Sequence, residues 1–350
     1  MNEGLYRVVD ANLNRAAEAI RVVEDLCRFV WNAKGFAREL KRHRHDVFAA
    51  VCSGGLDRAR LVLSRDTEGD VGRDHASPRG GGADTGTLAL RNLERAREAV
   101  RALEEAFRPS NPAASARLES IRYALYELEK GIARLGNHGA LRERIAAARV
   151  YLIASERLCR GPIVEVVSAA VAAGCDAVQL REKDRPDGAL LELARRLREV
   201  TARRGALFFV NDRPDIAALA GADGVHCGQD DLPAEQARRL LPSGALVGIS
   251  THSTAQALAA QTAGADYLGV GPVFATRTKE RLDPLLGADG LAAILEQVHV
   301  PAFAVGGIGP ETLPGLRAIG VERVALSSAL LASDDVSATV RSVRALLAAG

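Results

Sequence analysis

The sequence lacks the features by which several classes of protein are recognised. No apolar run in its 350 residues reaches the length of about 18 residues that a membrane-spanning helix needs. The opening stretch, MNEGLYRVVDANLNR, does not show the basic and then apolar pattern of a signal peptide. The net charge of +2 excludes a strong overall field that would attract nucleic acid or an anionic membrane. We therefore expect a cytoplasmic protein whose partners are small molecules and whose anion sites are local.

Several motifs of catalytic and cofactor chemistry are also missing. The five cysteines are scattered and never form a CxxC pair, which predicts reduced thiols and argues against structural zinc. There is no GxSxG motif, so no protein nucleophile is visible. A P-loop of the form GxxxxGK[ST] is absent, and the sequence therefore gives no independent support for ATP binding.

Residues 1–136 carry apolar residues at helical spacing, which predicts an all-helical N-terminal domain. The segment ANLNRAAEAIRVVEDLCRFVW places Leu13, Ala16 and Ile20 on one stripe, and LESIRYALYELEKGIARL shows the same period. Residues 68–86 lie between these helices, are rich in glycine and aspartate and have no apolar face. We expect them to form a long loop.

This domain contains an internal repeat, because NLNRAAEAIRVVED returns further along as NLERAREAVRALEE. Charged positions recur in register, Arg15 with Arg95 and Glu18 with Glu98. The spacing of three places each arginine beside a glutamate, so each helix can form its own ion pair. Two interpretations stay open. The helices are a duplicated, pseudo-symmetric pair with solvated charges, or they share a polar site.

From residue 149 to residue 350 the pattern changes to short apolar runs that alternate with helices. The runs are VYLIA, DAVQL, ALFFVN, DGVHC, LVGIS, DYLGVG, AFAVGG and RVALS. This alternation implies parallel strands joined by right-handed crossovers. GCD, GAD, GAD and GVE precede alternate runs; the glycine suits a helix C-cap and the acid turns the chain into the next strand.

The pattern over about 200 residues predicts an α/β fold, a (β/α)8 TIM barrel at the small end of its usual size. Residues 137–148 would be a linker or leading helix before it. The alternative is a doubly wound open sheet, against which the first strand lacks a following GxGxxG.

Polar residues follow nearly every apolar run, at the end where a (β/α)8 barrel places its active site. Arg181, Lys183 and Lys279 are cations, and Asp212 and Asp231 are carboxylates. Such a set suggests a polyphosphate held together with Mg²⁺, which takes one or two protein carboxylates and completes its shell with phosphate oxygens and water. Arginine offers phosphate a planar fork and lysine a point charge.

A second anion site is predicted further round the barrel. The glycines of GGIG, beginning at Gly306, allow backbone N–H groups to approach an anion, and Ser327 and Ser328 open a helix. The loops after strands seven and eight are the usual phosphate grip of this fold. Two phosphate sites in one mouth imply two phosphorylated substrates or one long bis-phosphate.

Structural explanations compete with each of these interpretations. Asp212 can be a helix N-cap before a proline, and the two glycines can form a tight turn. His226 fits a hydrogen-bonded histidine lining the barrel better than a general base, and His252 fits a helix start. Arg213 can pair with a neighbouring aspartate. The convergence of all these groups on one end of the strands favours a ligand site.

The chain from about residue 149 to residue 330 closely resembles thiamine-phosphate synthase. The segments QLREK, ND, GADGVHCGQDD, GIS-H, GPVFATRTK, GGI and SSAL occur in the order of that family. The resemblance implies a (β/α)8 barrel transferase that joins hydroxymethylpyrimidine diphosphate to a thiazole phosphate with Mg²⁺. Thiamine phosphate and pyrophosphate would be the products, and positioning and electrostatics would drive a dissociative substitution.

The resemblance carries site roles over by position. It assigns the pyrimidine diphosphate to Gln179, Leu180, Arg181, Glu182, Lys183, Asn211, Ser250 and Lys279, of which Arg181, Lys183, Ser250 and Lys279 are the catalytic candidates. It assigns Mg²⁺ to Asp212 and Asp231. It assigns the thiazole phosphate to Thr276, Arg277, Thr278, Gly306, Gly307, Ser327 and Ser328. Glu182 is expected to face away or to tether its loop. The neighbouring Asp230 leaves the choice of metal ligand open.

The N-terminal half resembles a helical domain that is fused to some thiamine-phosphate synthases and linked to phosphorylation of hydroxymethylpyrimidine phosphate. Its candidate residues are Arg15, Glu18, Arg65, Asp66, Asp70, Arg95 and Glu98. A docking or dimerisation domain is the alternative, and homo-oligomerisation is left open. For the barrel the alternatives are another phosphate-binding isomerase and a non-catalytic, thiazole-binding or regulatory module.

Overall fold

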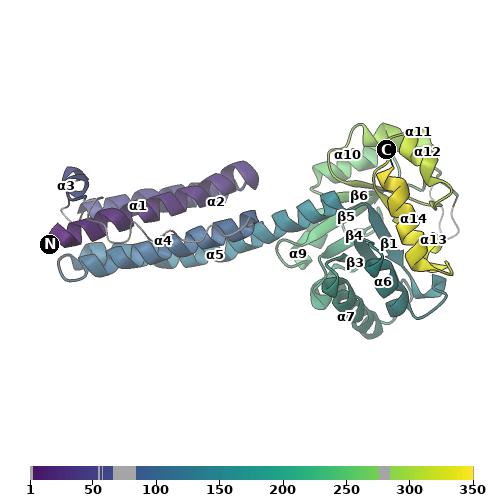
Figure 1. Ribbon diagram of the computed structural model, residues 1–350, viewed down its shortest axis with the longest axis horizontal. Coiled ribbons are helices and arrows are strands. Elements are labelled where there is room, and N and C mark those ends of the chain that lie inside the picture. The colour runs from purple at the N-terminus through teal and green to yellow at the C-terminus, as the bar shows by residue number, and fades with distance from the viewer. Residues whose placement is uncertain (1–2, 54–55, 57, 66–83, 276–283, 350) are drawn as a thin grey trace. The chain divides into compact units, whose positions relative to one another are not determined.

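Two compact units make up the chain, Met1–Ala140 and Leu141–Gly350. The computed structural model describes residues 3–53, 56, 58–65, 84–275 and 284–349 (Figure 1). The predicted loop of residues 68–86 lies almost wholly outside these described residues. Among the helices that are described, none is long and apolar enough to cross a membrane.

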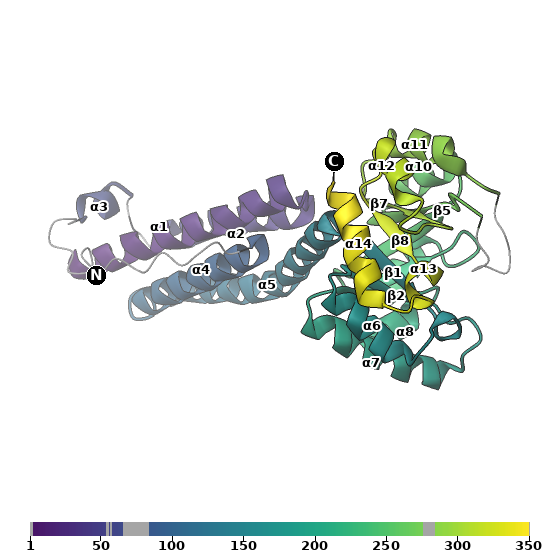
Figure 2. The ribbon, with the colours of Figure 1, turned by 45° about the vertical axis from the view of Figure 1, so that its right-hand side comes forward.

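The described part of unit 1 is helical, as the apolar periodicity predicted. Figures 1 and 2 show its long helices side by side, and α1 packs against both α4 and α2. The predicted stripe of α1 is buried in this core, including Leu13, Ala16 and Ile20. The elements are α1 (Glu3–Asp25), the π-helical turn η1 (Leu26–Val30), α2 (Lys34–Ser53), α3 (Arg58–Leu63), α4 (Thr85–Phe107) and the first part of α5 (Pro112–Ala147).

The two repeated helices make a similar buried contact with the helix that follows each of them. In the first copy, Nε of Arg44 on α2 donates to Oε2 of Glu24 on α1 at 3.1 Å. In the second copy, Nε of Arg122 on α5 donates to Oε2 of Glu104 on α4 at 3.0 Å. The two glutamates occupy equivalent positions of the repeat and both are buried. The two repeated helices, α1 and α4, therefore each hold a buried glutamate against an arginine of the helix that follows.

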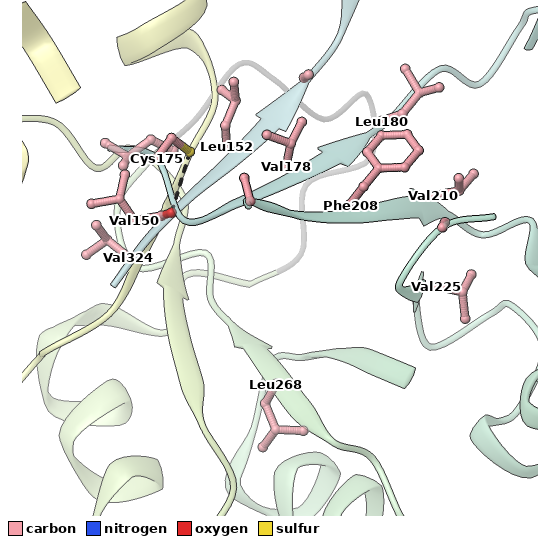
Figure 3. Close-up of a cluster of buried hydrophobic side chains, with 14 of the residues drawn as sticks. Val150, Leu152, Cys175, Val178, Leu180, Phe208, Val210, Val225, Leu268 and Val324 are labelled. Atoms are coloured by element: carbon pink, nitrogen blue, oxygen red, sulfur yellow. Dashed lines mark hydrogen bonds between the residues drawn. The ribbon is translucent and has the colours of Figure 1, made fainter. Parts of the chain in front are cut away.

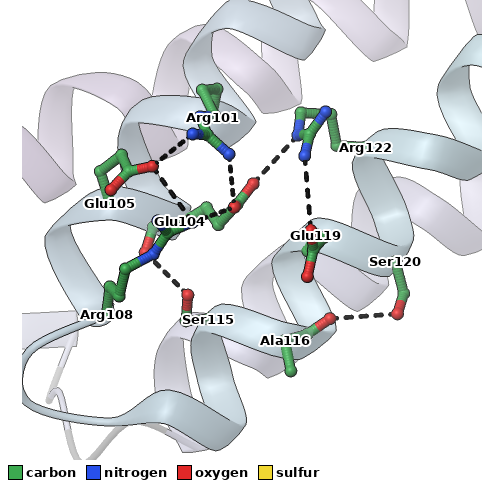
Figure 4. A network of polar contacts seen from close by, with 9 residues as sticks. All are labelled: Arg101, Glu104, Glu105, Arg108, Ser115, Ala116, Glu119, Ser120 and Arg122. Carbon is green, nitrogen blue, oxygen red and sulfur yellow. Dashed lines mark hydrogen bonds and ion pairs between the residues drawn. The ribbon is translucent and has the colours of Figure 1, made fainter.

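The buried charge of the second hairpin is held by several arginines. Figure 4 shows the carboxylate of Glu104 facing Arg101, Arg108 and Arg122, at nitrogen–oxygen distances of 2.6, 2.7 and 3.0 Å. A carboxylate removed from water needs such partners, because an unpaired buried charge is strongly destabilising. The expected ion pairs at spacing three, Arg15 with Glu18 and Arg95 with Glu98, are absent from the part of unit 1 that the structure describes. These side chains are exposed. The glutamates that are paired across the hairpins are Glu24 and Glu104.

Unit 2 contains a closed barrel whose eight strands lie within the described residues. The strands run parallel and pair in sequence order, and β8 pairs with β1, with Val324 beside Val150. This closure confirms the (β/α)8 barrel and excludes the open-sheet alternative. The strands are β1 (Val150–Ala154), β2 (Ala177–Leu180), β3 (Leu207–Asn211), β4 (Gly224–Cys227), β5 (Leu246–Thr251), β6 (Tyr267–Val270), β7 (Ala302–Val305) and β8 (Val324–Leu326).

Helices surround the strands of this barrel. They are η2 (Glu156–Leu158), α6 (Ile163–Ala172), α7 (Asp187–Arg203), α8 (Pro214–Ala220), α9 (Ala234–Leu240), α10 (Thr254–Thr262), α11 (Gly287–Leu295), α12 (Leu313–Ala318), α13 (Ser328–Leu331) and α14 (Val336–Ala348).

Strand alternation divides the side chains of the barrel between two apolar cores. The outer core lies between strands and helices, and Figure 3 shows part of it, including Val178 and Leu180 of β2. The inner core fills the barrel with Tyr151, Phe209 and Tyr267, among others. The next residue along β2 from Val178, Gln179, therefore takes the inward direction, toward the mouth.

The recurring glycine–acid phrase has a structural role at the amino ends of the strands. Gly174, Gly221, Gly264 and Gly320 have positive φ, as the predicted helix C-caps require. The aspartate of each of the first three phrases accepts a backbone N–H from the strand that comes before it in the sequence. The carboxylate of Asp176 accepts the N–H of Val150, that of Asp223 accepts the N–H of Phe208, and that of Asp266 accepts the N–H of Val247, each at 2.9 Å. The phrase thus ties neighbouring strands together at the end of the barrel remote from the mouth.

Asp223→Ala tests this role. The carboxylate is 6% exposed and also accepts a hydrogen bond from Arg198 at 2.7 Å. Its removal leaves the buried N–H of Phe208 and the partly exposed Arg198 without this partner, and we expect a loss of about 1–3 kcal/mol in the free energy of unfolding. Glu322→Ala changes the acid of the GVE phrase, which is exposed, and should cost less than about 0.5 kcal/mol. Urea unfolding measures both, and equal losses would contradict the assigned role.

Candidate functional site

A cavity of about 410 Å³ opens among the carboxyl ends of the strands. The predicted residues of the described chain that line it come from most strands of the barrel. They are Gln179, Arg181, Lys183, Asn211, Asp212, Asp231, Ser250, Gly306, Gly307, Ser327 and Ser328. His226 and His252, which were expected to have structural roles, line the cavity as well. The structure therefore brings the cationic, acidic and glycine-rich predicted residues into one cavity.

Two carboxylates from neighbouring loops meet at one side of the cavity. Asp212 follows β3 with a left-handed φ of 60°, and its N–H donates to the carbonyl of His226 at 2.8 Å. Asp231 follows β4 and accepts the N–H of Gly228 at 2.6 Å. Burial, together with a hydrogen bond and the charge of Asp231, raises the pKa of Asp212 to about 7, although Lys183 and Arg181 act to lower it. Asp212 therefore favours its protonated form more than an ordinary aspartate does.

The basic residues and their supporting contacts lie on the loop after β2. The N–H of Arg181 donates to the carbonyl of Ala154 at 2.8 Å, which continues the β1–β2 pairing to the mouth. Arg181 and Lys183 both act on the Asp212 carboxyl, so they face the acidic pair. Glu182 accepts the N–H of Glu156 at 2.5 Å. It tethers the loop after β2 to the residues after β1, which is one of the two roles expected for it.

Leu180 is the predicted ligand residue whose side chain is turned from the cavity. It is 1% exposed and packs in the helix-facing core of Figure 3. The alternation of β2 requires this, because its neighbour Gln179 faces inward. A side-chain contact between Leu180 and a ligand in the mouth is therefore excluded, and the expectation is corrected on this point.

The glycine-rich end of the cavity depends on the absence of side chains. Gly306 and Gly307 have φ of 102° and 62°. A Cβ on Gly306 would lie 2.7 Å from Cα of Pro272, and one on Gly307 would lie 2.7 Å from the carbonyl oxygen of Ala275. Only glycine suits both the backbone conformation and the available space, so the loop brings bare backbone to the cavity wall.

The two serines after β8 have different environments. The hydroxyl of Ser327 donates to the carbonyl of Ile153 at 2.9 Å, so this side chain ties the end of β8 to β1. Ser328 is the first residue of α13 and lines the same end of the cavity. The hydroxyl of Ser327 has a structural contact that sequence reasoning did not foresee.

Several predicted site residues lie outside the described residues. They are Thr276, Arg277, Thr278 and Lys279 of the barrel, and Asp66 and Asp70 of unit 1. In unit 1, Arg65 binds Asp10 through two hydrogen bonds of 2.6 and 3.0 Å. Sequence reasoning missed Asp10, which is 7% exposed although it is charged. The sequence distance between the two residues gave no signal of this contact.

A row of hydrogen-bonded side chains beneath the mouth was only partly foreseen. His226 is hydrogen-bonded within the barrel, as its position in an apolar run suggested, through Ser250 at 2.9 Å and Tyr267 at 3.2 Å. Tyr267 in turn lies 2.9 Å from the hydroxyl of Tyr151. The two tyrosines were missed. The sequence feature that could have predicted them is a tyrosine at a strand position that faces the inside of the barrel.

A closed (β/α)8 barrel with cations, paired carboxylates and bare glycine backbone around one mouth defines a barrel enzyme class suited to anionic substrates. The family model described as thiamine monophosphate synthase matches residues 150–330. The model of the ThiD2 family matches residues 7–131. The chain belongs to the thiamine-phosphate synthase family and is an enzyme of that family.

Full-length relatives and a solved structure support this membership. The thiamine-phosphate synthase of Gloeobacter violaceus is 42% identical, over 96% of this chain and 94% of the relative. The thiamine-phosphate synthase of Synechococcus sp. strain WH7803 is 40% identical, over 97% of this chain and 96% of the relative. The solved structure of thiamine phosphate pyrophosphorylase from Pyrococcus furiosus is 36% identical, with a TM-score of 0.54, and covers 59% of this chain and 98% of its own.

The raised pKa of Asp212 predicts a pH dependence of stability in the presence of a chelator. Between about pH 4 and about pH 7 the folded chain holds a proton that an unfolded aspartate has released. Stability from this group therefore falls as the pH rises through that window. We expect the melting temperature of the wild type to fall relative to that of Asp212→Asn between about pH 5 and about pH 8. If the difference in melting temperature between the two proteins does not change with pH, the raised pKa of Asp212 is contradicted. Asp230→Asn is the control variant.

Proposed function

We propose that the barrel condenses 4-amino-2-methyl-5-(diphosphooxymethyl)pyrimidine with a thiazole ethyl phosphate to give thiamine phosphate and pyrophosphate. One observation carries this proposal: the acidic pair, the basic loop and the glycine-rich loop line a single cavity. The basic loop follows β2 and the acidic residues follow β3 and β4, whereas the glycines follow β7. This arrangement suits a diphosphate on one side and a monophosphate on the other.

Asp212 and Asp231 are the residues that fit Mg²⁺. Their carboxylates lie within hydrogen-bond reach of each other, and burial with the nearby charge of Asp231 raises the pKa of Asp212, so a cation at this point would favour its ionised form. Two carboxylates with room for phosphate oxygens are the donor set that Mg²⁺ prefers. When bound, the ion would neutralise part of the charge of the departing diphosphate.

The substitution needs positioning and charge stabilisation from the protein. The bond between the pyrimidine methylene carbon and the diphosphate oxygen breaks, and its electron pair leaves with pyrophosphate. Arg181 and Lys183, with Lys279 by resemblance, would stabilise the growing negative charge, in the manner of a preorganised oxyanion site. The electron-rich aminopyrimidine stabilises the methylene cation, and the thiazole nitrogen supplies the electron pair of the new bond. No covalent protein intermediate is required.

Asp231 and Asp230 form a matched pair of neighbours that tests the assignment. Asp231 lines the cavity, whereas Asp230 is exposed and lies in the polar depression beside it. We expect Asp231→Asn to lower kcat for thiamine phosphate formation by about 10²- to 10³-fold, because the substitution keeps the size but removes the charge. Asp230→Asn should remain within about twofold of wild type.

Thiamine phosphate formed from the two substrates with Mg²⁺ is the quantity to measure, and melting curves check that both variants fold. Near wild-type turnover in Asp231→Asn would overturn the metal assignment. An equal loss in both variants would show that general charge at the rim, and not this carboxylate, matters.

We propose that unit 1 phosphorylates hydroxymethylpyrimidine phosphate with ATP, which would supply the diphosphate that the barrel consumes. The match to the ThiD2 family over residues 7–131 supports this proposal. Arg65 supports it as well, because Asp10 holds its guanidinium in a fixed bidentate geometry while the arginine side chain remains 46% exposed. Arg15, Glu18, Arg95 and Glu98, together with Asp66 and Asp70, stay candidates on the resemblance alone.

Arg65→Ala in the full chain separates the two proposed activities. Given hydroxymethylpyrimidine phosphate, ATP, Mg²⁺ and thiazole phosphate, this variant should make thiamine phosphate at least about tenfold more slowly than wild type. Given the pyrimidine diphosphate directly, it should match wild type. Arg60→Ala is the control, since Arg60 stacks on Tyr6 of the same unit. A wild type that makes no product from the monophosphate would leave a docking or dimerisation role for unit 1.

A further inference from the structure

Arg213, the residue that follows Asp212, joins two helices of unit 2 through one guanidinium group. Its Nε and Nη2 donate to the two carboxylate oxygens of Asp215 on α8, at 2.9 and 2.7 Å. Its Nη1 donates to Oδ1 of Asp187, the first residue of α7, at 2.6 Å. Sequence reasoning allowed for a pair with a neighbouring aspartate, but Asp187 lies 26 residues away in the sequence and was not expected.

The two contacts of this guanidinium have different geometric roles. Two parallel hydrogen bonds to one carboxylate fix the plane of an arginine side chain. The pair with Asp215 therefore orients Arg213, and the remaining nitrogen is directed at Asp187. A lysine could not do the same, because its ammonium group is a single point of charge on a flexible stem. The arrangement thus fixes the start of α7 relative to the start of α8.

The backbone that carries Arg213 is also constrained on both sides. Asp212 has a φ of 60°, which is uncommon for a residue with a side chain and persists only where surrounding contacts determine it. The N–H of Arg213 donates to the carbonyl of Asn211 at 2.8 Å. Pro214 disfavours a helical conformation for Arg213, which has φ and ψ of −117° and 82°. A shift of the Arg213 side chain would therefore act directly on Asp212.

The basic loop, residues 181–186, is held on both of its sides. On the side of β1, Nη1 of Arg185 donates to Oε2 of Glu156 at 2.5 Å. On the side of β3, the loop ends at Asp187, which Arg213 binds. Arg213 is therefore a direct link between the loop that carries the two cations of the cavity and the segment that carries one carboxylate of the acidic pair.

Stability alone does not account for this link. The side chains of Arg213, Asp187 and Asp215 are 35%, 70% and 49% exposed. Ion pairs as exposed as these contribute little to the stability of a fold. Geometry is what such a link can supply, because a diphosphate has to contact the loop cations and a metal ion at the same time. A small displacement of one group from the other is costly for binding and for catalysis.

We infer that Arg213 is a positioning residue for the diphosphate, because it holds the basic loop and Asp212 at the separation that one metal-bound diphosphate spans. Arg213 is not among the described residues that line the cavity, so it acts through Asp187 and Asp212 and does not touch the substrate. This inference rests on the proposed function of the barrel, and it adds to that function a residue outside the reacting site.

The test compares the binding of two ligands to the full chain by calorimetry. One is pyrophosphate in the presence of Mn²⁺, which takes the same oxygen ligands as Mg²⁺, and the other is the thiazole phosphate. Arg213→Gln should raise the Kd of pyrophosphate by about tenfold or more, the loss typical when a residue that orients a metal ligand is removed. The Kd of the thiazole phosphate should not change, whereas a general loosening of the barrel would raise both.

Further variants separate the link from the charge of the arginine. Asp187→Ala should weaken pyrophosphate binding in the same way, and the double variant with Arg213→Gln should weaken it no further, because both substitutions break one contact. Arg213→Lys keeps the charge without the planar fork and should retain most of the loss. Arg195→Gln is the control, since Arg195 is 52% exposed and pairs with Glu192 within α7 at 2.8 Å.

Four results would overturn the inference, once melting curves have shown that the variants fold. They are unchanged pyrophosphate binding in Arg213→Gln, an equal loss for both ligands, full recovery in Arg213→Lys, and an equal loss in Arg195→Gln. Failure of the proposed function would look different, because the wild type would then bind no pyrophosphate with Mn²⁺ and make no thiamine phosphate, and that result would overturn both.

Discussion

The pairing of β8 with β1 closes the sheet of unit 2, and this closure determines where the polar residues of the barrel meet. With all strands parallel, every carboxyl end lies at one rim and every amino end at the other. Residues far apart in sequence, such as Lys183, Asp231 and Gly307, are thereby brought into one cavity. The opposite rim carries Asp176, Asp223 and Asp266, which bind backbone N–H groups of adjacent strands. Stability and chemistry thus lie at opposite ends of the same strands.

Charge balance at the mouth follows from this convergence. The carboxyls of Asp212 and Asp231 are close enough that one of them favours its protonated form, and the nearby Lys183 and Arg181 do not fully offset this. The proposed Mg²⁺ and diphosphate would together supply the cation and the anion that this charge balance calls for.

Sequence reasoning identified the barrel well because its signals are local. The eight apolar runs correspond to the strands within the described residues, and Gln179 was expected to face inward from its place in β2. Leu180 was assigned to the ligand as part of a contiguous segment, and strand alternation places its side chain in the outer core. The hydroxyl of Ser327 is engaged by Ile153 on β1. No sequence pattern reports such a contact between distant strands.

In unit 1, too, the sequence did not predict the contacts between different helices. The recurrence of charges identified the duplication, but spacing of three suggested pairs within a helix. Spacing of three does join Arg101 to Glu104 within α4, but not the predicted pairs, and Glu24 with Arg44 and Glu104 with Arg122 pair across each hairpin. Helical spacing predicts neighbours on one helix, whereas the burial of a carboxylate depends on which helix covers it. The contact between Asp10 and Arg65 was not predicted for the same reason, because the two residues lie far apart in the sequence.

A crystal structure of the full chain with Mg²⁺, pyrophosphate and thiamine phosphate tests the central claim most directly. The account predicts pyrophosphate against Arg181 and Lys183, with the metal between it and the carboxylates of Asp212 and Asp231. It also predicts the aminopyrimidine edge between Gln179 and Ser250, and the thiamine phosphate group at the Gly306–Gly307 loop. Pyrophosphate bound away from the acidic pair, or an aminopyrimidine edge that faces neither Gln179 nor Ser250, would contradict it.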